Sequence, residues 1–406
     1  MTHVVFVAPV FMQATLRFVT EVGSLPNMKL SIISHDRLER LPKGLQERLS
    51  GHYRVANCLD PGQLVIAAKA IAKNAGPIHR LFGALEELQV PLAQARDYLK
   101  IEGLNHQAAQ NFRDKARMKA VLRQAGIPCA RYKLVHDPQE AWAFIKEVGF
   151  PIIIKPPAGA GARQTFEVQD SDSLNDYLAV YAPSAQNPAL LEEFIQGDEH
   201  SFETISIKGR PVWHSLTHYY PNPLQVLRNP FLKWCIVLPK EIDHPRYEDI
   251  RLTNNKALSA LGMHTGLTHL EWFRRKDGSL AISEVAARPP GAQIVTLMSI
   301  AHEMNFYHAW AKLMVFDTFE APQRKYSAGA AFLRGVGSGK VKKISGIDRL
   351  PKEVHDVVVE AKLPQIGQFS GRGYEGDGYV LVRHPDTEAV KKALLHLVST
   401  IQVHYE

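Results

Sequence analysis

Two glutamates stand where the strands of a hairpin would bring them together. Glu271 lies in a strand-like stretch, and Glu284 lies in the apolar stretch Leu280 to Val285, which follows the turn signal Asp277-Gly278. Carboxylates on paired strands can face the same side of a sheet. Mg²⁺ takes oxygen ligands and commonly completes its shell with phosphate oxygens. The pattern therefore predicts a site for a hard divalent cation.

Three basic residues, two before and one after a loop of small residues, could bind an anion. Lys115 falls in a basic amphipathic helix, and Lys155 ends a short apolar strand directly before the loop Ala158 to Ala162. Lysines can neutralise phosphate oxygens while the amides of such a loop close over them. Arg288, four residues after Glu284, can grip a carboxylate or a phosphate with two N–H groups.

Acidic residues follow an apolar run between these two groups. The stretch Leu190 to Glu199 begins apolar and ends in an acidic turn. Such residues can bind adenine and ribose hydroxyls. Each residue alone has an ordinary explanation, because most lysines are solvated and most glutamates on hairpins form surface pairs. Their joint occurrence in this order favours a nucleotide site.

The elements that must position these residues are of the α/β kind. Val4 to Val10 and Lys29 to Ser34 are short apolar runs separated by the amphipathic stretch Gln13 to Val22, which predicts a βαβ start. No glycine-rich turn follows the first run, so a phosphate grip on that helix is not expected. After Ala321-Pro322 come short glycine-containing strands and a final helix, Asp386 to Ser399.

Composition excludes several classes of protein. The chain has 406 residues and a formal net charge of +7. The three cysteines form no CxxC pair, which favours a reducing cytoplasm. No apolar run approaches the roughly 20 residues needed to cross a bilayer. Without an RNA-binding aromatic motif or a dense basic stripe, no nucleic-acid partner is expected.

Taken together, the chain resembles the ATP-grasp superfamily, and within it the carboxylate–amine ligases of the L-amino-acid-ligase and biotin-carboxylase-like type. The resemblance rests on Leu85 to Val90, Arg113 to Lys115, Phe150 to Pro156, Glu192 to Glu199 and Glu284 to Pro289. It implies an α/β ATP-grasp fold in three parts. These are a Rossmann-like preATP-grasp domain (1–112), a two-subdomain ATP-grasp core with a mobile lid (113–321, lid about 129–190) and a small C-terminal α+β domain (322–406).

The resemblance also implies a role for each residue. Lys115 and Lys155 would contact the phosphates of ATP, and Glu192 would accept from the adenine amino group. Glu199 would hold the ribose, and Arg288 would steady the transferred phosphoryl group. Glu271 and Glu284 would bind one or two Mg²⁺ ions, with Mn²⁺ as the alternative ion. The lid loop would comprise Gly159, Ala160, Gly161 and Ala162, and the adenine edge would be read by the backbone of Glu193, Phe194 and Ile195.

Two departures from the family pattern stand out. Many relatives have Asn two residues after the second metal glutamate, where this chain has Ala286. A second ion would lose a ligand there, so binding of two metals is less secure than binding of one. The lid loop also lacks adjacent glycines, although its residues remain small.

The implied reaction is ATP-dependent ligation. A carboxylate is activated as an acyl phosphate, and an amine then displaces phosphate to give an amide or peptide bond. The resemblance implies that Lys155, Glu284 and Arg288 are the catalytic residues. The alternatives are a carboxylase-like enzyme that uses bicarbonate and a nucleotide-binding subunit without turnover, which Ala286 would favour.

The expected partners are a small-molecule carboxylate and an amine, with no membrane partner and a homodimer as the prior for assembly. Arg228 lies in a proline- and aromatic-rich loop and is a candidate carboxylate anchor, with an ordinary surface loop as the alternative. His269 is a candidate substrate contact, with a core histidine as the alternative.

Overall fold

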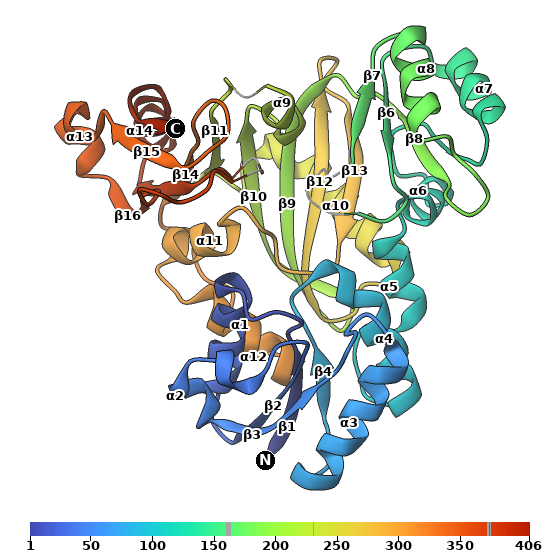
Figure 1. Ribbon diagram of the computed structural model, residues 1–406, viewed down its shortest axis with the longest axis vertical. Helices are drawn as coiled ribbons and strands as arrows, with labels where there is room; N and C mark the ends of the chain where they lie inside the picture. The colour runs from blue at the N-terminus through green and yellow to red at the C-terminus, as the bar shows by residue number, and fades with distance from the viewer. Residues whose placement is uncertain (160–163, 230, 372, 374) are drawn as a thin grey trace.

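The computed structural model describes residues 1–159, 164–229, 231–371, 373 and 375–406 (Figure 1). Three residues expected in the phosphate-binding loop, Ala160, Gly161 and Ala162, lie outside the described residues. Among the helices that are described, none is long and apolar enough to cross a membrane.

The chain begins with a parallel sheet. Strands β1 (Thr2–Val7), β2 (Met28–Ser34), β3 (Leu49–Arg54) and β4 (Arg80–Phe82) lie in the order β3-β2-β1-β4. Alternate residues of β1 enter two cores: Val4 and Phe6 pack with helix α1 (Gln13–Gly23), and Val5 and Val7 pack with helix α3 (Pro61–Ala75). A strand covered on both faces must be apolar throughout, so the Rossmann-like start is confirmed.

An antiparallel sheet forms the centre of the molecule. In the described part of the chain its eight strands lie in the order β13-β12-β9-β10-β11-β14-β17-β16. Their bounds are β9 (Gly197–Ile207), β10 (Arg210–Tyr220), β11 (Trp234–Leu238), β12 (Gly266–Arg275), β13 (Leu280–Ala286), β14 (Ser327–Leu333), β16 (Val358–Lys362) and β17 (Gly378–His384). The last three are C-terminal strands, so the end of the chain continues the central sheet.

A separate small sheet lies at the upper right of Figure 1, in the segment predicted to form the lid subdomain. Its strands β5 (Tyr132–Val135), β6 (Ile152–Lys155), β7 (Phe166–Val168) and β8 (Ala189–Glu193) lie in the order β5-β8-β6-β7. Helices α7 (Pro138–Val148) and α8 (Ser171–Val180) cover it, and it has its own apolar core.

The remaining helices connect and cover these sheets. Helix α6 (Lys115–Gln124) begins at Lys115 because the Asp114 side chain accepts from the Arg117 amide at 2.9 Å, an N-cap contact. The other elements are α2 (Lys43–Gln46), α4 (Gln89–Leu99), α5 (His106–Arg113), α9 (Pro223–Arg228), α10 (Glu248–Leu261), α11 (Ile294–His302), α12 (Phe306–Phe316), α13 (Lys352–His355), α14 (Thr387–Thr400), β15 (Val341–Ser345), β18 (Gln402–Tyr405) and short 3₁₀ turns at Leu38–Arg40, Glu86–Leu88, Pro245–Tyr247 and Ile347–Arg349.

Candidate active site

A cavity of about 430 Å³ opens between the N-terminal sheet, the lid subdomain and the central sheet. Most residues predicted for the nucleotide and metal lie on its wall: Lys115, Lys155, Gly159, Glu192, Glu193, Phe194, Ile195, Glu199, His269, Glu271, Glu284 and Arg288. These residues come from segments far apart in sequence. The fold therefore brings together the set that the sequence singled out, and their roles stay predictions.

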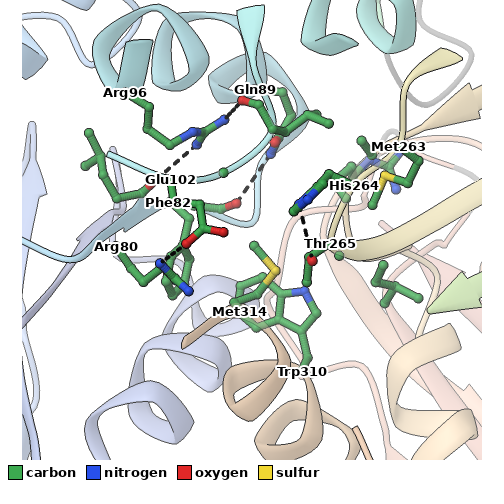
Figure 2. A pocket seen from close by; sticks show the side chains of 18 of the residues that line it. Arg80, Phe82, Gln89, Arg96, Glu102, Met263, His264, Thr265, Trp310 and Met314 are labelled. Atoms are coloured by element: carbon green, nitrogen blue, oxygen red, sulfur yellow. Dashed lines mark hydrogen bonds and ion pairs between the residues drawn. The ribbon is translucent and has the colours of Figure 1, made fainter. Parts of the chain in front are cut away.

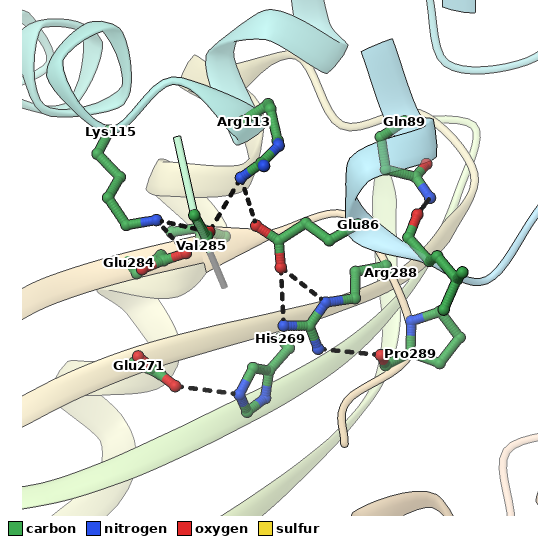
Figure 3. Close-up of polar contacts among 12 residues, drawn as sticks. Glu86, Gln89, Arg113, Lys115, His269, Glu271, Glu284, Val285, Arg288 and Pro289 are labelled. Carbon is green, nitrogen blue, oxygen red and sulfur yellow. Dashed lines mark hydrogen bonds and ion pairs between the residues drawn. The ribbon is translucent and has the colours of Figure 1, made fainter. Parts of the chain in front are cut away.

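The two candidate metal ligands are direct neighbours across a hairpin. Strands β12 and β13 pair antiparallel, with Glu271 opposite Glu284 and a bulge immediately after Glu271. Lys115 Nζ lies 2.8 Å from Glu284 Oε1 (Figure 3). Burial alone would raise the pKa of Glu284, but attraction by Lys115 and Lys155 outweighs it and lowers that pKa to about 2. Glu284 is therefore an ionised carboxylate at neutral pH.

Glu199 adds a third carboxyl to the same end of the cavity. Burial, together with repulsion from Glu271, raises the pKa of Glu199 well above its ordinary value. A divalent cation beside these carboxylates would relieve that repulsion, so the donor set fits Mg²⁺ or Mn²⁺. In the described residues no group of three or more metal-ligating side chains is already assembled. Phosphate oxygens or water would complete the shell.

Lys155 shares a buried carboxylate with a second lysine that sequence reasoning missed. Glu192 lies 3.0 Å from Lys155 Nζ and 3.2 Å from Lys119 Nζ. Burial lowers the pKa of Lys119, whereas Glu192 and Glu284 outweigh burial and raise the pKa of Lys155. Lys119 follows Lys115 by one helical turn in α6, and this i, i+4 spacing was the signal that could have identified it.

The start of the lid loop is held by two cations. The carbonyl oxygen of Gly159 accepts from Lys115 Nζ at 3.0 Å and from Arg113 Nη1 at 2.9 Å. Lys115 therefore contacts both the candidate metal ligand Glu284 and the loop expected to close over phosphate. A phosphate bound here would compete with a carbonyl and a carboxylate for the same ammonium.

Glu86 links the N-terminal domain to the predicted catalytic arginine (Figure 3). Its Oε2 accepts from Arg288 Nε and lies equally close to Arg288 Nη2, both at 2.9 Å, and its Oε1 accepts from Arg113 at 3.2 Å. Arg288 Nη1 also donates to the Pro289 carbonyl at 3.0 Å. Burial lowers the pKa of Arg288, but Glu86 outweighs it and raises that pKa. Glu86 was noticed only as part of the motif Leu85 to Val90.

His269 is held between two carboxylates. Its Nδ1 lies 2.8 Å from Glu203 Oε1, and its Nε2 lies 3.5 Å from Glu271 Oε1. Burial lowers the pKa of His269, but hydrogen bonds to Glu203 and Glu271 outweigh it and raise that pKa to about 9. Glu203 is completely buried and also accepts from Ser201 at 2.6 Å and Thr217 at 3.2 Å. His269 therefore supports Glu271 and also lines the cavity.

Two predicted residues point elsewhere. Arg228 is not on the wall of the large cavity. It forms an ion pair with Glu167 of β7 and donates to the Glu167 carbonyl at 2.8 Å, which ties α9 to the lid. The Glu193 side chain pairs with Arg131 at 2.6 Å and Arg275 at 3.3 Å. These contacts join strands of the lid and the core.

Arg288 also lines a second cavity, of about 60 Å³. Figure 2 shows this cavity with Arg80, Arg96 and Trp310 around it. Arg80 pairs with Glu102 and with Asp317 at 3.0 Å each. Buried Arg96 donates to the carbonyls of Leu81 at 3.0 Å and Leu104 at 2.6 Å. Arg80 is therefore paired within this cavity, whereas Arg96 Nε has no hydrogen-bond partner among the described residues. The cavity lies where β4 and α4 meet β12 and α12.

Comparisons with known proteins agree with this fold. Residues 120–303 match the ATP-grasp domain model and are an ATP-grasp domain. The chain has the ATP-grasp fold: a crystal structure of L-amino acid ligase from Bacillus licheniformis superposes with a TM-score of 0.79 at 19% identity, covering 100% of this chain and 99% of that one. N5-carboxyaminoimidazole ribonucleotide synthetase from Thermotoga maritima superposes with a TM-score of 0.72 at 17% identity, covering 100% of both chains.

Sequence relatives extend over part of the chain. An L-arginine-specific L-amino acid ligase of Bacillus subtilis is 25% identical over 249 residues, which is 59% of this chain and 59% of the relative. An alanine–anticapsin ligase of Bacillus subtilis is 28% identical over 225 residues, 50% of this chain and 47% of the relative. The match thus spans about half to three fifths of these relatives. The resemblance to the ATP-grasp superfamily is confirmed.

Proposed function

We propose that the protein is an ATP-dependent ligase that joins a carboxylate to an amine and releases ADP and phosphate. The observation that carries this proposal is the facing pair Glu271 and Glu284, with Lys115 on Glu284 and Lys155 in the same cavity. In such a set the lysines neutralise the charge of a polyphosphate, and the glutamates bind its cation. The names of the sequence relatives support carbon–nitrogen ligation as the reaction.

The nucleotide would lie between the lid and the central sheet. Lys115 and Lys155 would take its phosphates, Glu199 its ribose and the backbone of Glu193 to Ile195 its adenine edge. Glu192 is buried between Lys119 and Lys155. It would reach the adenine amino group only through an oxygen that these lysines leave accessible.

Glu271 and Glu284 would hold the metal ion. Mg²⁺, when bound, would supply positive charge that neutralises the phosphates during phosphoryl transfer. Ala286 supplies no oxygen, so we favour one firmly held ion and a weaker second one. His269 would keep Glu271 oriented.

The chain's own residues would then position the reactants. The substrate carboxylate attacks the γ-phosphorus, the bond to ADP breaks, and an acyl phosphate forms. The amine nitrogen attacks the acyl carbon, phosphate leaves with the C–O bond electrons, and the nitrogen loses a proton. Arg288 keeps N–H groups on Nη1 and Nη2 beyond those used by Glu86 and Pro289, and these would face the transferred group. Closure of the lid would exclude water from the acyl phosphate.

The test is phosphate release with ATP, Mg²⁺ and a matrix of acids and amines. A productive pair should give ADP and a product lighter by one water than the two substrates. Glu284→Gln should abolish turnover, whereas Glu320→Gln, an exposed carboxylate paired with Lys312, should leave it unchanged. Full turnover by Glu284→Gln would refute the metal assignment.

The same assay separates the alternatives. Incorporation of labelled bicarbonate without an amine product would indicate the carboxylase-like reaction. ATP binding without ADP formation across the matrix would indicate a nucleotide-binding subunit, as Ala286 would favour. The cytoplasmic location, the homodimer and the domain boundaries 1–112, 113–321 and 322–406 stay predictions.

A further inference from the structure

The large cavity has a second wall that none of the nucleotide residues occupies. This apolar wall is formed by α1 and the residue before it, by β10, α9 and β11, and by the start of α11 with the loop before it. In Figure 1, α1 and α11 lie to the left of the central strands β9 and β12, and strands β6 and β8 lie to their right. The members that line the cavity are Met12, Ala14, Thr15, Phe18, Tyr219, Leu224, Trp234, Ala292 and Ile294.

The apolar wall is closely packed against other side chains. Phe18 packs edge-on against Tyr307 and Trp310, with ring centroids 4.8 Å apart in each case. Tyr219 contacts Trp234 at 6.0 Å, and Trp234 stacks on Phe332 at 4.6 Å. Phe18, Tyr219, Trp234 and Ile294 belong to one apolar core that joins the N-terminal domain to the central sheet. Packing against a shared core restricts how far these side chains can shift.

The described members of the apolar wall carry no charged side chain. Arg17 of α1 donates to Thr296 at 3.1 Å. Glu375 Oε1 accepts from the Ala292 amide at 3.3 Å, but neither Arg17 nor Glu375 lines the cavity. Burying an unpaired charge against such a wall costs several kcal/mol, roughly the value for an ion placed in an apolar medium.

Thr15 is a polar residue of this wall whose hydroxyl is shielded. Its side chain is 2% exposed, and its Oγ1 is buried without a hydrogen-bond partner among the described residues. Because that oxygen is shielded from solvent, it presents no polar group to the cavity. The wall therefore fits a mainly apolar group.

We propose that the apolar wall selects a carboxylic acid or amino acid with an uncharged, apolar side chain as one of the two substrates. This inference rests on the proposed ligase function. Ala14 is the position that sets the size of the accepted side chain, because it lines the cavity from the first turn of α1 with only a methyl group.

The first experiment is the phosphate-release assay with leucine, methionine and phenylalanine against arginine, glutamate and serine. The apolar group should exceed the others by about tenfold or more in kcat/KM. Best turnover with arginine or glutamate would overturn the inference and leave the ligase function standing. If no acid is turned over, the proposed ligase function fails, and the melting temperature of the protein with ADP and Mg²⁺ then tests the apolar wall. A rise in melting temperature with leucine but not with arginine supports the inference. The absence of any shift with leucine overturns it.

The second experiment uses neighbouring positions of one helix. Ala14→Leu should raise KM for phenylalanine by about tenfold while leaving KM for alanine little changed. Gln13→Leu is the matched control, because Gln13 is exposed and does not line the cavity, and it should change neither value. Equal effects of Ala14→Leu on both substrates, or equal effects of the two variants, would contradict the role of Ala14.

Discussion

Two cavities meet at Arg288, and their charges are arranged in different ways. In the small cavity Arg80 has two carboxylates of its own, and Arg96 donates to two carbonyls while its Nε has no partner among the described residues. In the large cavity charges are shared: Glu192 serves two lysines and Glu86 serves two arginines. Charges that satisfy one another locally stabilise a domain contact, whereas shared and uncompensated charges suit a charged ligand.

The largest effect is expected when one of the two lysines that share Glu192 is removed. Lys119→Met should lower the free energy of unfolding by about 3 kcal/mol, because a fully buried ion pair is broken. It should also weaken ATP binding, since Lys155 is then the remaining lysine on Glu192. Arg80→Met in the small cavity should cost about 1 kcal/mol or less, since Arg80 is partly exposed. Denaturant unfolding measures the loss of stability in each variant, and ATP titration measures the loss of affinity. Equal losses in the two variants would contradict the proposed difference between the cavities.

The next effect compares one substitution in each cavity. Glu86→Gln should lower kcat by about 10²-fold with the fold intact, because Arg288 and Arg113 lose the carboxylate that orients them. Glu102→Gln, which removes a partner of Arg80, should leave kcat unchanged. Steady-state kinetics and circular dichroism on both variants provide the measurement. A kcat for Glu86→Gln close to that of the unaltered protein would show that Arg288 is oriented without it.

The smallest expected effect concerns histidines on the two faces of the central sheet. Glu203 keeps His269 charged on the cavity face, with a pKa of about 9. On the other face burial, assisted by Arg274 and Arg246, lowers the pKa of His200 to about 4. The unfolded chain therefore binds more protons than the folded one between pH 6.5 and about 4. Stability should fall as the pH drops through this window.

His200→Phe tests this contrast. The variant should reduce the loss of stability on acidification by up to about 1.4 kcal/mol per pH unit, the contribution of one proton. Denaturant unfolding across the same pH window gives the slope. Phe suits the site because His200 packs against Trp272 at 4.8 Å between ring centroids. An unchanged slope would mean that His200 titrates normally in the folded protein.

Much of the fold could be predicted because its signals are local. The apolar runs near Val4 and Lys29 became β1 and β2, and the hairpin that pairs Glu271 with Glu284 is confirmed. Each depends on hydrophobic alternation or on turn residues a few positions apart.

The partners of the site residues could not be predicted in the same way. Glu86 is separated from Arg288 by 202 positions, and Lys115 from Glu284 by 169. Nothing local marks such contacts, since they arise only when three sheets assemble. Arg228 shows the converse: a loop rich in proline and aromatic residues suggested a substrate anchor, but its carboxylate partner is Glu167 of the same chain.

The continuity of the central sheet has a consequence for dividing the chain. β11 pairs along its length with β14, which lies beyond residue 321. A fragment that ends at residue 321 would turn β11, whose sequence is the apolar Trp234–Leu238, into an open sheet edge. Exposed apolar edges recruit other chains. Such a fragment should aggregate during expression. In the full chain, β14 covers this edge by pairing with β11.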